Sequence, residues 1–181
     1  MAGKLIFVSG LAGSGKTTLI GGALGDIENI EVLTTYTTRP RRSSEQESYE
    51  YIFVTDQEYE RLKALSNNWD ETLYKGYKYA SDADKFIADL QNGVNVIVAV
   101  TPNIDDIQTM TGIYGQKPVT VWINTPKELA FERVSNDPTR SRRIEDESVK
   151  RYFDILFTPK NVLVDDIKSF VNLIRSITQQ T

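Results

Sequence analysis

The chain contains neither cysteine nor histidine. This double absence excludes disulfides, thiol nucleophiles, zinc sites built from those ligands and acid–base catalysis by histidine. Any catalysis must therefore use lysine, arginine, carboxylates, hydroxyls, backbone amides and a metal held by oxygen ligands. An excess of positive charge is also lacking, because 21 Lys and Arg stand against 25 Asp and Glu, for a net charge of −4. No global field draws such a protein to nucleic acid, and we expect no nucleic-acid partner.

Long hydrophobic runs are missing as well. The first apolar run, at residues 5–8, is too short for a signal peptide or a membrane span. We therefore expect a cytoplasmic protein with no membrane partner. A chain of 181 residues, 40% of them hydrophobic, suits one domain that buries a core without disulfides. Both a monomer and a homodimer agree with this composition.

Short β-rich runs alternate with helical patterns along most of the chain. We expect core strands at residues 5–8, 30–33, 94–100, 119–123 and 162–164. Helices are expected at 17–24, where Gly25 would end the first one, and at 82–90, 103–110, from 125, from about 146 and at 167–177. Residues 34–81 interrupt the alternation with small strands at 52–54 and 73–79 and a helix capped by Thr55. Alternating strands and helices predict an α/β protein with a central parallel sheet flanked by helices.

A glycine-rich motif follows the first strand. Residues 10–17, GLAGSGKT, satisfy the pattern G-x-x-x-x-G-K-[ST], with an apolar strand before it and a helical pattern after it. Glycines let successive backbone amides point at phosphate oxygens, the lysine reaches the β- and γ-phosphates, and the hydroxyl ligates Mg²⁺. We expect a P-loop NTPase fold that binds ATP and Mg²⁺, with Thr17 as metal ligand. The nucleotide would contact Gly10, Ala12, Gly13, Ser14, Gly15, Lys16, Thr17 and Thr18.

Two arginine-rich segments lie far from this loop in the sequence. Residues 35–42, TYTTRPRR, hold three arginines near a stiffening proline, and the segment 133–151 holds Arg133, Arg140, Arg142, Arg143 and Arg151. Because phosphoryl transfer is catalysed mainly by positioning and charge neutralisation, arginine suits this task. We interpret the segments as an acceptor-phosphate site and a lid. The chain is then one domain: a core of residues 1–33 and 82–181, a lid at about 134–146 and an acceptor-binding lobe at 34–81.

Four motifs in this order resemble the guanylate kinase family. They are the opening GKLIFVSG with the P-loop, TTRPRR at 37–42 (the family has TTRPPR), YEYIFV at 49–54 (D-Y-x-F-V) and GYKY at 76–79 (G-N-Y-Y-G). The resemblance covers most of the chain to about Arg151. It implies a nucleoside monophosphate kinase that transfers the γ-phosphate of ATP to GMP or dGMP.

The resemblance also implies residue roles. Acceptor phosphate would be bound by Arg39, Arg42, Tyr51 and Tyr79. Thr35 and either Asp70 or Glu71 would contact the base, where a carboxylate accepts the two hydrogen bonds that guanine N1–H and N2–H₂ donate. Lys16, Arg39, Arg133, Arg151 and one of Arg140 or Arg142 would carry the transfer.

The central strand departs from the family pattern. Val98 and Val100 stand where the family has two acids, one serving the metal site and one the guanine, and Thr101 is a partial substitute. Two alternatives therefore stay open. One is a P-loop kinase of the same build with a different nucleotide or small-molecule acceptor. The other is a non-catalytic binding module on the same fold, which the intact P-loop disfavours.

Overall fold

In this computed structural model, residues 2–41, 49–74, 76–100, 104–135 and 147–179 are described. Its larger part is a five-stranded parallel sheet in the order β2-β7-β1-β8-β9. The strands are β1 (Leu5–Ser9), β2 (Ile30–Val32), β7 (Asn95–Ala99), β8 (Val119–Ile123) and β9 (Ile155–Phe157). This confirms the α/β class and the parallel sheet. The strands lie beside one another while distant in sequence, as crossover connections require.

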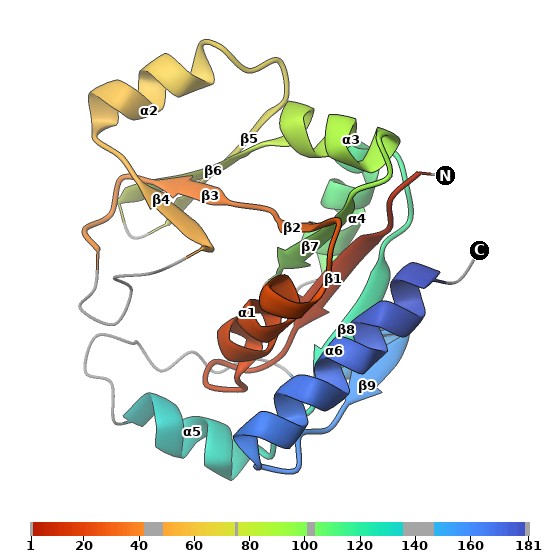
Figure 1. Ribbon diagram of the computed structural model, residues 1–181. Coiled ribbons are helices and arrows are strands. Elements are labelled where there is room, and N and C mark those ends of the chain that lie inside the picture. The colour runs from red at the N-terminus through yellow and green to blue at the C-terminus, as the bar shows by residue number, and fades with distance from the viewer. Residues whose placement is uncertain (1, 42–48, 75, 101–103, 136–146, 180–181) are drawn as a thin grey trace.

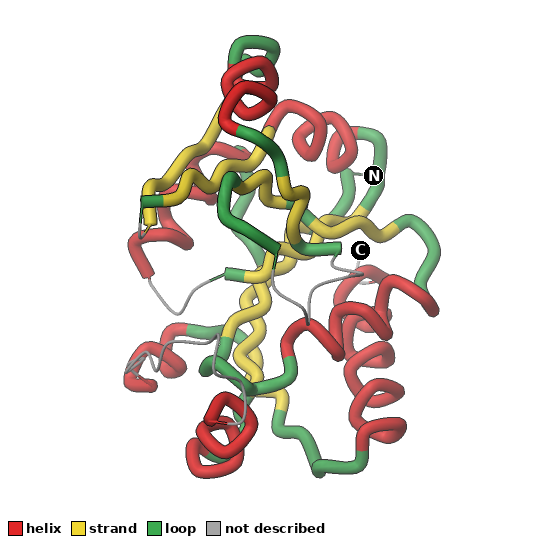
Figure 2. Tube along the Cα trace, turned by 90° about the vertical axis from the view of Figure 1, so that its left-hand side faces the viewer, coloured by secondary structure: helices red, strands yellow, loops and turns green. Residues whose placement is uncertain are grey.

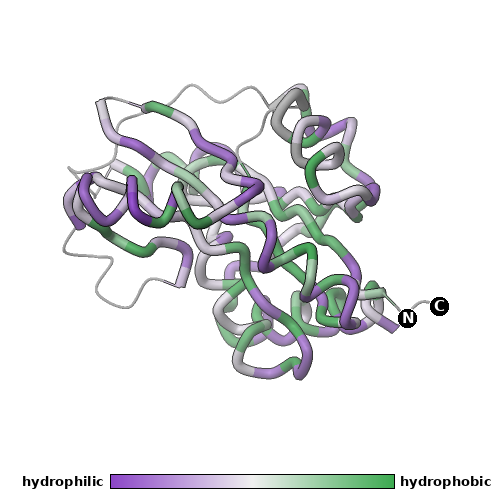
Figure 3. The backbone as a smooth tube through the Cα atoms, turned by 90° about the horizontal axis from the view of Figure 1, so that it is seen from above, coloured by the Kyte–Doolittle hydropathy of each residue, from purple (hydrophilic) through white to green (hydrophobic). Residues whose placement is uncertain are grey.

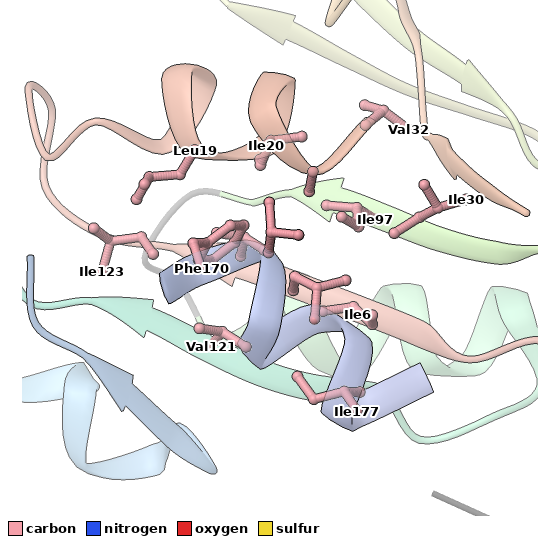
Figure 4. Packing of buried hydrophobic residues seen from close by; sticks show 14 residues of the cluster. Ile6, Leu19, Ile20, Ile30, Val32, Ile97, Val121, Ile123, Phe170 and Ile177 are labelled. Atoms are coloured by element: carbon pink, nitrogen blue, oxygen red, sulfur yellow. The ribbon is translucent and has the colours of Figure 1, made fainter. Parts of the chain in front are cut away.

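Helices cover both faces of this sheet (Figure 1). They are α1 (Lys16–Asp26), α3 (Ala83–Gln91), α4 (Ile104–Tyr114), α5 (Lys127–Ser135) and α6 (Leu163–Gln179). Ile6 and Val8 of β1 pack with α1 and α6, whereas Leu5 and Phe7 pack with α3 and Tyr114. Figure 4 shows the first of these layers, with Leu19 and Ile20 of α1 and Phe170 and Ile177 of α6 lying on the sheet. Burial on both faces explains why β1 is apolar at consecutive positions.

The described residues between Thr35 and Asp82 form a second sheet, apart from the parallel one. A four-stranded sheet in the order β4-β3-β6-β5 contains β3 (Thr35–Thr37), β4 (Tyr51–Phe53), β5 (Trp69–Tyr74) and β6 (Tyr77–Asp82). Helix α2 (Asp56–Lys63) crosses one of its faces. The lobe lies at the upper left of Figure 1, and Figure 2 shows both sets of strands in yellow. Seen from above, α2 is largely hydrophilic, whereas green hydrophobic stretches run through the core (Figure 3).

Three sequence-based expectations about the core were wrong or inexact. Residues 162–164 form no strand: Val162 precedes α6, and the last strand is β9. Gly25 does not end α1, which continues to Asp26. The helix expected from about residue 146 is a 3₁₀ helix over Glu147–Tyr152. No described helix is long and apolar enough to cross a membrane.

Candidate active site

The phosphate loop joins β1 to α1 with an unusual backbone. Gly10, Gly13 and Gly15 have φ of 150°, 82° and 96°, in the region that side chains rarely adopt. A Cβ on Gly13 would also lie 2.3 Å from the carbonyl oxygen of Ala130. Backbone conformation therefore favours glycine at all three positions, and close packing adds a second reason at Gly10 and Gly13. They bring the loop against α5 and start α1 at Lys16, so that the first-turn amides of α1 face the loop.

Hydrogen bonds from side chains hold the loop's carbonyl groups. Lys16 Nζ donates to the carbonyl oxygens of Gly10 and Leu11, at 2.5 and 3.0 Å. Thr125 Oγ1 donates to Ser14 O at 2.8 Å, and Arg133 Nη1 donates to Gly13 O at 3.2 Å. With its carbonyls turned toward these cations and hydroxyls, the loop is arranged to offer amides and positive charge to an anion.

A cavity of about 420 Å³ opens on this loop. Its lining includes the phosphate loop and first turn of α1, Arg133, and residues from the connection between β9 and α6: Ala12, Gly13, Ser14, Gly15, Lys16, Thr17, Thr18, Leu19, Arg133, Pro159, Asn161, Leu163 and Asp166. The Ser14 hydroxyl is buried and has no hydrogen-bond partner within the described part of the chain. A nucleoside triphosphate fits this combination of size, cationic side chains and an unsatisfied hydroxyl.

One face of the lobe sheet gathers the residues expected to bind the acceptor. Directly paired residues on neighbouring strands point to the same side of a sheet. The register pairs Thr35 with Tyr51, Thr37 with both Phe53 and Tyr79, and Asp70 with Ser81. With Thr72 opposite Tyr79 on β5, these pairs place Thr35, Tyr51, Asp70 and Tyr79 on one side. We call this side the acceptor face.

Arg39 lies at this acceptor face. Its guanidinium is 4.9 Å from the ring centre of Tyr51 and 5.0 Å from that of Phe53, and the residue is 7% exposed. Nη1 donates to the carbonyl oxygen of Pro40 at 3.1 Å. The Tyr51 and Tyr79 rings meet edge-on with centres 6.4 Å apart. A guanidinium and two phenols thus converge at one place, which is a chemically suitable group of donors for a phosphate dianion.

Glu71 lies on the opposite face of the same strand. It accepts from Lys63 Nζ at 2.5 Å and from the Tyr59 hydroxyl at 3.3 Å, both on α2. The hydrogen bond from Lys63 holds the pKa of the Glu71 carboxyl below its usual range. Asp70 instead lies near buried Tyr114, whose phenol pKa is raised by burial and then by the charge of Asp70. Of the two carboxylates left open by the sequence, only Asp70 shares a face with Tyr51 and Tyr79.

The lobe touches the phosphate-loop helix through residues 49 and 50. Thr17 Oγ1 donates to Glu50 Oε1 at 2.9 Å, and the Tyr49 hydroxyl donates to the carbonyl oxygen of Thr17. The described residues contain no group of three or more acidic side chains able to hold a metal by themselves. A hydroxyl beside one carboxylate fits Mg²⁺, which takes oxygen ligands and fills its remaining positions with phosphates and water.

The two valines of the central strand do not lie at the contact between Thr17 and Glu50. Val98 and Val100 are 4% and 6% exposed and belong to the apolar cluster formed with α3 and Tyr114. Neither position contributes a polar group to the metal or the base.

Of the other predicted site residues, Arg42, Thr101, Arg140 and Arg142 lie outside the described residues, as does nearly all of the expected lid. Arg151 is exposed, donates to the Tyr152 hydroxyl at 2.9 Å and is not among the residues that line the cavity. Arg133, by contrast, both contacts the loop and lines the cavity.

Sequence reasoning missed two contributions. One wall of the cavity is formed by Pro159, Asn161, Leu163 and Asp166. The sequence pattern instead predicts a strand at residues 162–164, within this segment. The turn before α6 is marked by the positive φ of Asn161, 65°. A backbone angle of this kind cannot be inferred from a single sequence. Glu50 was noted only as part of a motif, and its partner Thr17 lies 33 residues away.

The parallel sheet, the loop between β1 and α1 and the cavity above it define a P-loop nucleotide-binding protein. Comparison with known proteins narrows this class: the family model described as guanylate kinase matches residues 2–168. The chain therefore belongs to the guanylate kinase family, the nucleoside monophosphate kinases that its motifs resembled.

Individual relatives agree with this placement. Guanylate kinase of Bacteroides thetaiotaomicron is 28% identical over 92% of this chain and 83% of its own length. Guanylate kinase of Chlorobium chlorochromatii is 26% identical over 94% and 95%. The crystal structure of guanylate kinase from Anaplasma phagocytophilum has a TM-score of 0.65, covering 99% of this chain and 88% of that chain at 18% identity. The structural likeness supports the fold, and the family match supports the class of enzyme.

Proposed function

We propose that this chain transfers the γ-phosphate of ATP to GMP or dGMP and so forms the nucleoside diphosphate. The observation that carries the proposal is the junction of the two halves of the site. Glu50 contacts Thr17 at the phosphate loop, and the next residue, Tyr51, already belongs to the acceptor face beside Arg39. The ATP side and the acceptor side of the site are therefore adjacent, because Glu50 and Tyr51 are consecutive residues.

The chemistry needs no histidine or covalent intermediate. Lys16 and the loop amides bind the β- and γ-phosphates, and Mg²⁺, held at Thr17, would supply charge neutralisation. An oxygen of the acceptor phosphate attacks the γ-phosphorus in line, and the bond to the β-phosphate oxygen breaks as ADP leaves. Because the attacking oxygen is already ionised, no general base is required. Arg133, with Arg151 and one of Arg140 or Arg142, would neutralise the transferring phosphoryl group.

Acceptor recognition follows from the acceptor face. Arg39, Arg42, Tyr51 and Tyr79 would bind the acceptor phosphate. Asp70, rather than Glu71, would accept from the guanine, with Thr35 beside it. The wall of Pro159, Asn161 and Leu163 would receive the nucleoside end of ATP, since these residues line the same cavity as the phosphate loop. A cytoplasmic location, where both nucleotides occur, completes the proposal.

The test is a panel of acceptors. Purified protein is mixed with Mg-ATP and, separately, with GMP, dGMP, AMP, CMP, UMP and dTMP, and ADP formation is followed. We expect turnover with GMP or dGMP to exceed the others by at least about 100-fold, as buried hydrogen-bonding sites reject wrong partners strongly. Lys16→Ala, assayed in parallel, should lose this turnover and thereby exclude a contaminating kinase. Preference for another acceptor, or ATP binding without any turnover, would overturn the proposal.

A further inference from the structure

Thr17 is held by two consecutive residues of the lobe. Its hydroxyl donates to Glu50 Oε1 at 2.9 Å, and its carbonyl oxygen accepts from the Tyr49 hydroxyl. The Tyr49 ring lies against α1 at Gly21, where an added Cβ would come within 3.2 Å of the ring. Burial, and then the charge of Glu50, raises the pKa of the Tyr49 phenol above its usual range.

A hydroxyl that binds a cation is oriented by the group that accepts its hydrogen bond, and a carboxylate is well suited to this role. Thr17 would offer a lone pair of Oγ1 to Mg²⁺, and its proton must then go to an acceptor. In P-loop enzymes an aspartate at the end of a core strand shares the metal site with the Ser or Thr of the loop. Here β7 ends with Val98 and Ala99 and is followed by Val100, and both valines are buried among apolar side chains. Among the described residues, the carboxylate that accepts from Thr17 belongs to Glu50.

We propose that Glu50, on the acceptor-binding lobe and not on the core strand, is the carboxylate of the magnesium site. Its ionised carboxylate accepts the hydrogen bond of the Thr17 hydroxyl, which would turn an oxygen lone pair toward the cation, and adds negative charge beside it. Glu50 is thus a positioning residue for the metal. The inference rests on the proposed use of Mg-ATP, but not on the identity of the acceptor.

The test measures metal binding, without turnover. Mn²⁺ replaces Mg²⁺, and its affinity for the protein–ADP complex is followed by the electron paramagnetic resonance signal of free Mn²⁺. ADP affinity is measured separately in EDTA. We expect Glu50→Gln to weaken Mn²⁺ binding by about 10-fold or more, the usual effect of removing a carboxylate that orients a metal ligand. Metal-free ADP should bind as tightly or more tightly, because a negative charge near the phosphates is lost.

A matched control is Glu58→Gln, which removes the same charge from α2. Its partner is Arg61, at 2.7 and 2.9 Å, and it should leave Mn²⁺ affinity within about twofold of the parent. The parent's thermal midpoint should be retained by both variants. Glu50→Gln and Glu58→Gln binding Mn²⁺ equally well would overturn the inference, as would an equal loss of Mn²⁺ and metal-free ADP affinity in Glu50→Gln.

Failure of the role proposed for Glu50 can be distinguished from failure of the proposed GMP kinase activity. A parent protein that phosphorylates GMP while Glu50→Gln keeps full Mn²⁺ affinity refutes only the role of Glu50. A parent whose Mn²⁺ affinity depends on Glu50 but which does not phosphorylate GMP refutes only the assignment of GMP as acceptor.

Discussion

Asp70 and Glu71 are neighbours with similar chemistry and different surroundings. On β5 they point to opposite faces, so that Asp70 shares the side of Tyr79 and Glu71 is bound to Lys63 and Tyr59. We predict that Asp70→Asn raises the KM for GMP by about 30- to 150-fold, equivalent to about 2–3 kcal/mol. The amide nitrogen would face the guanine donors, and one buried hydrogen bond would be lost. Steady-state kinetics at saturating Mg-ATP measure this change.

Glu71→Gln is the matched control for that variant. It removes the same charge one residue away, and the KM for GMP should stay within about twofold of the parent because the side chain lies on the α2 side of the sheet. Equal effects of the two variants would show that net charge, and not a contact from Asp70, governs GMP binding.

At the scale of elements, sequence patterns succeeded where a local rule and the tertiary environment agreed. The apolar runs of β1 and β8 are buried strands, and Thr55 caps α2 by accepting from the amide of Glu58 at 3.2 Å. The run of residues 162–164 misled because its side chains are exposed: Leu163 is 61% and Val164 59% exposed at the start of α6. The turn at Asn161 and the bond from the Lys160 amide to Asp166 at 2.6 Å begin this helix.

The candidate site, like the fold, was predictable from the sequence only where its residues are close together in the chain. The phosphate loop was evident because all its residues are contiguous, whereas the partners of Thr17 come from residues 32 and 33 positions away. The choice between Asp70 and Glu71 depended on strand register, which the sequence left open because the lobe strands carry aromatic side chains on both faces.

Helix α1 offers a test of the misjudged Gly25. The residue lies within α1, and a Cβ there would meet nothing within 4 Å. Gly25→Ala should therefore raise the free energy of unfolding by about 0.4–1 kcal/mol, because alanine has the higher helix propensity and a more restricted unfolded state. Urea titration followed by circular dichroism measures the change.

The same substitution one turn earlier should have the opposite sign. A Cβ on Gly22 would lie 2.4 Å from Cγ2 of Ile167, a stiff β-branched side chain on α6. Gly22→Ala should lower the free energy of unfolding by about 1–2 kcal/mol despite the gain in propensity, since overpacking costs more. A stabilising Gly22→Ala would contradict the close packing of α1 against α6.

At the scale of the whole molecule, core and lobe are distinct sheets, and one of the contacts between them is at Thr17. Tyr49 and Glu50 hold this residue, and Tyr51 follows on the acceptor face. Ordering that contact costs conformational entropy, and a ligand at either sheet that stabilises it prepares the site for the other. We predict that Mg²⁺ with a non-hydrolysable ATP analogue tightens GMP binding by about fivefold or more, as measured by calorimetry.

Thermodynamic linkage provides an internal control for this prediction. GMP must tighten the binding of the Mg-nucleotide by the same factor. Tyr49→Phe is the informative variant: it removes the hydroxyl that bonds Thr17 and keeps the ring that packs on Gly21. The coupling factor should fall toward one while each ligand alone binds within about threefold of the parent. An undiminished factor in Tyr49→Phe would mean that the two halves communicate elsewhere, whereas no coupling in the parent would mean that donor and acceptor sites fill independently.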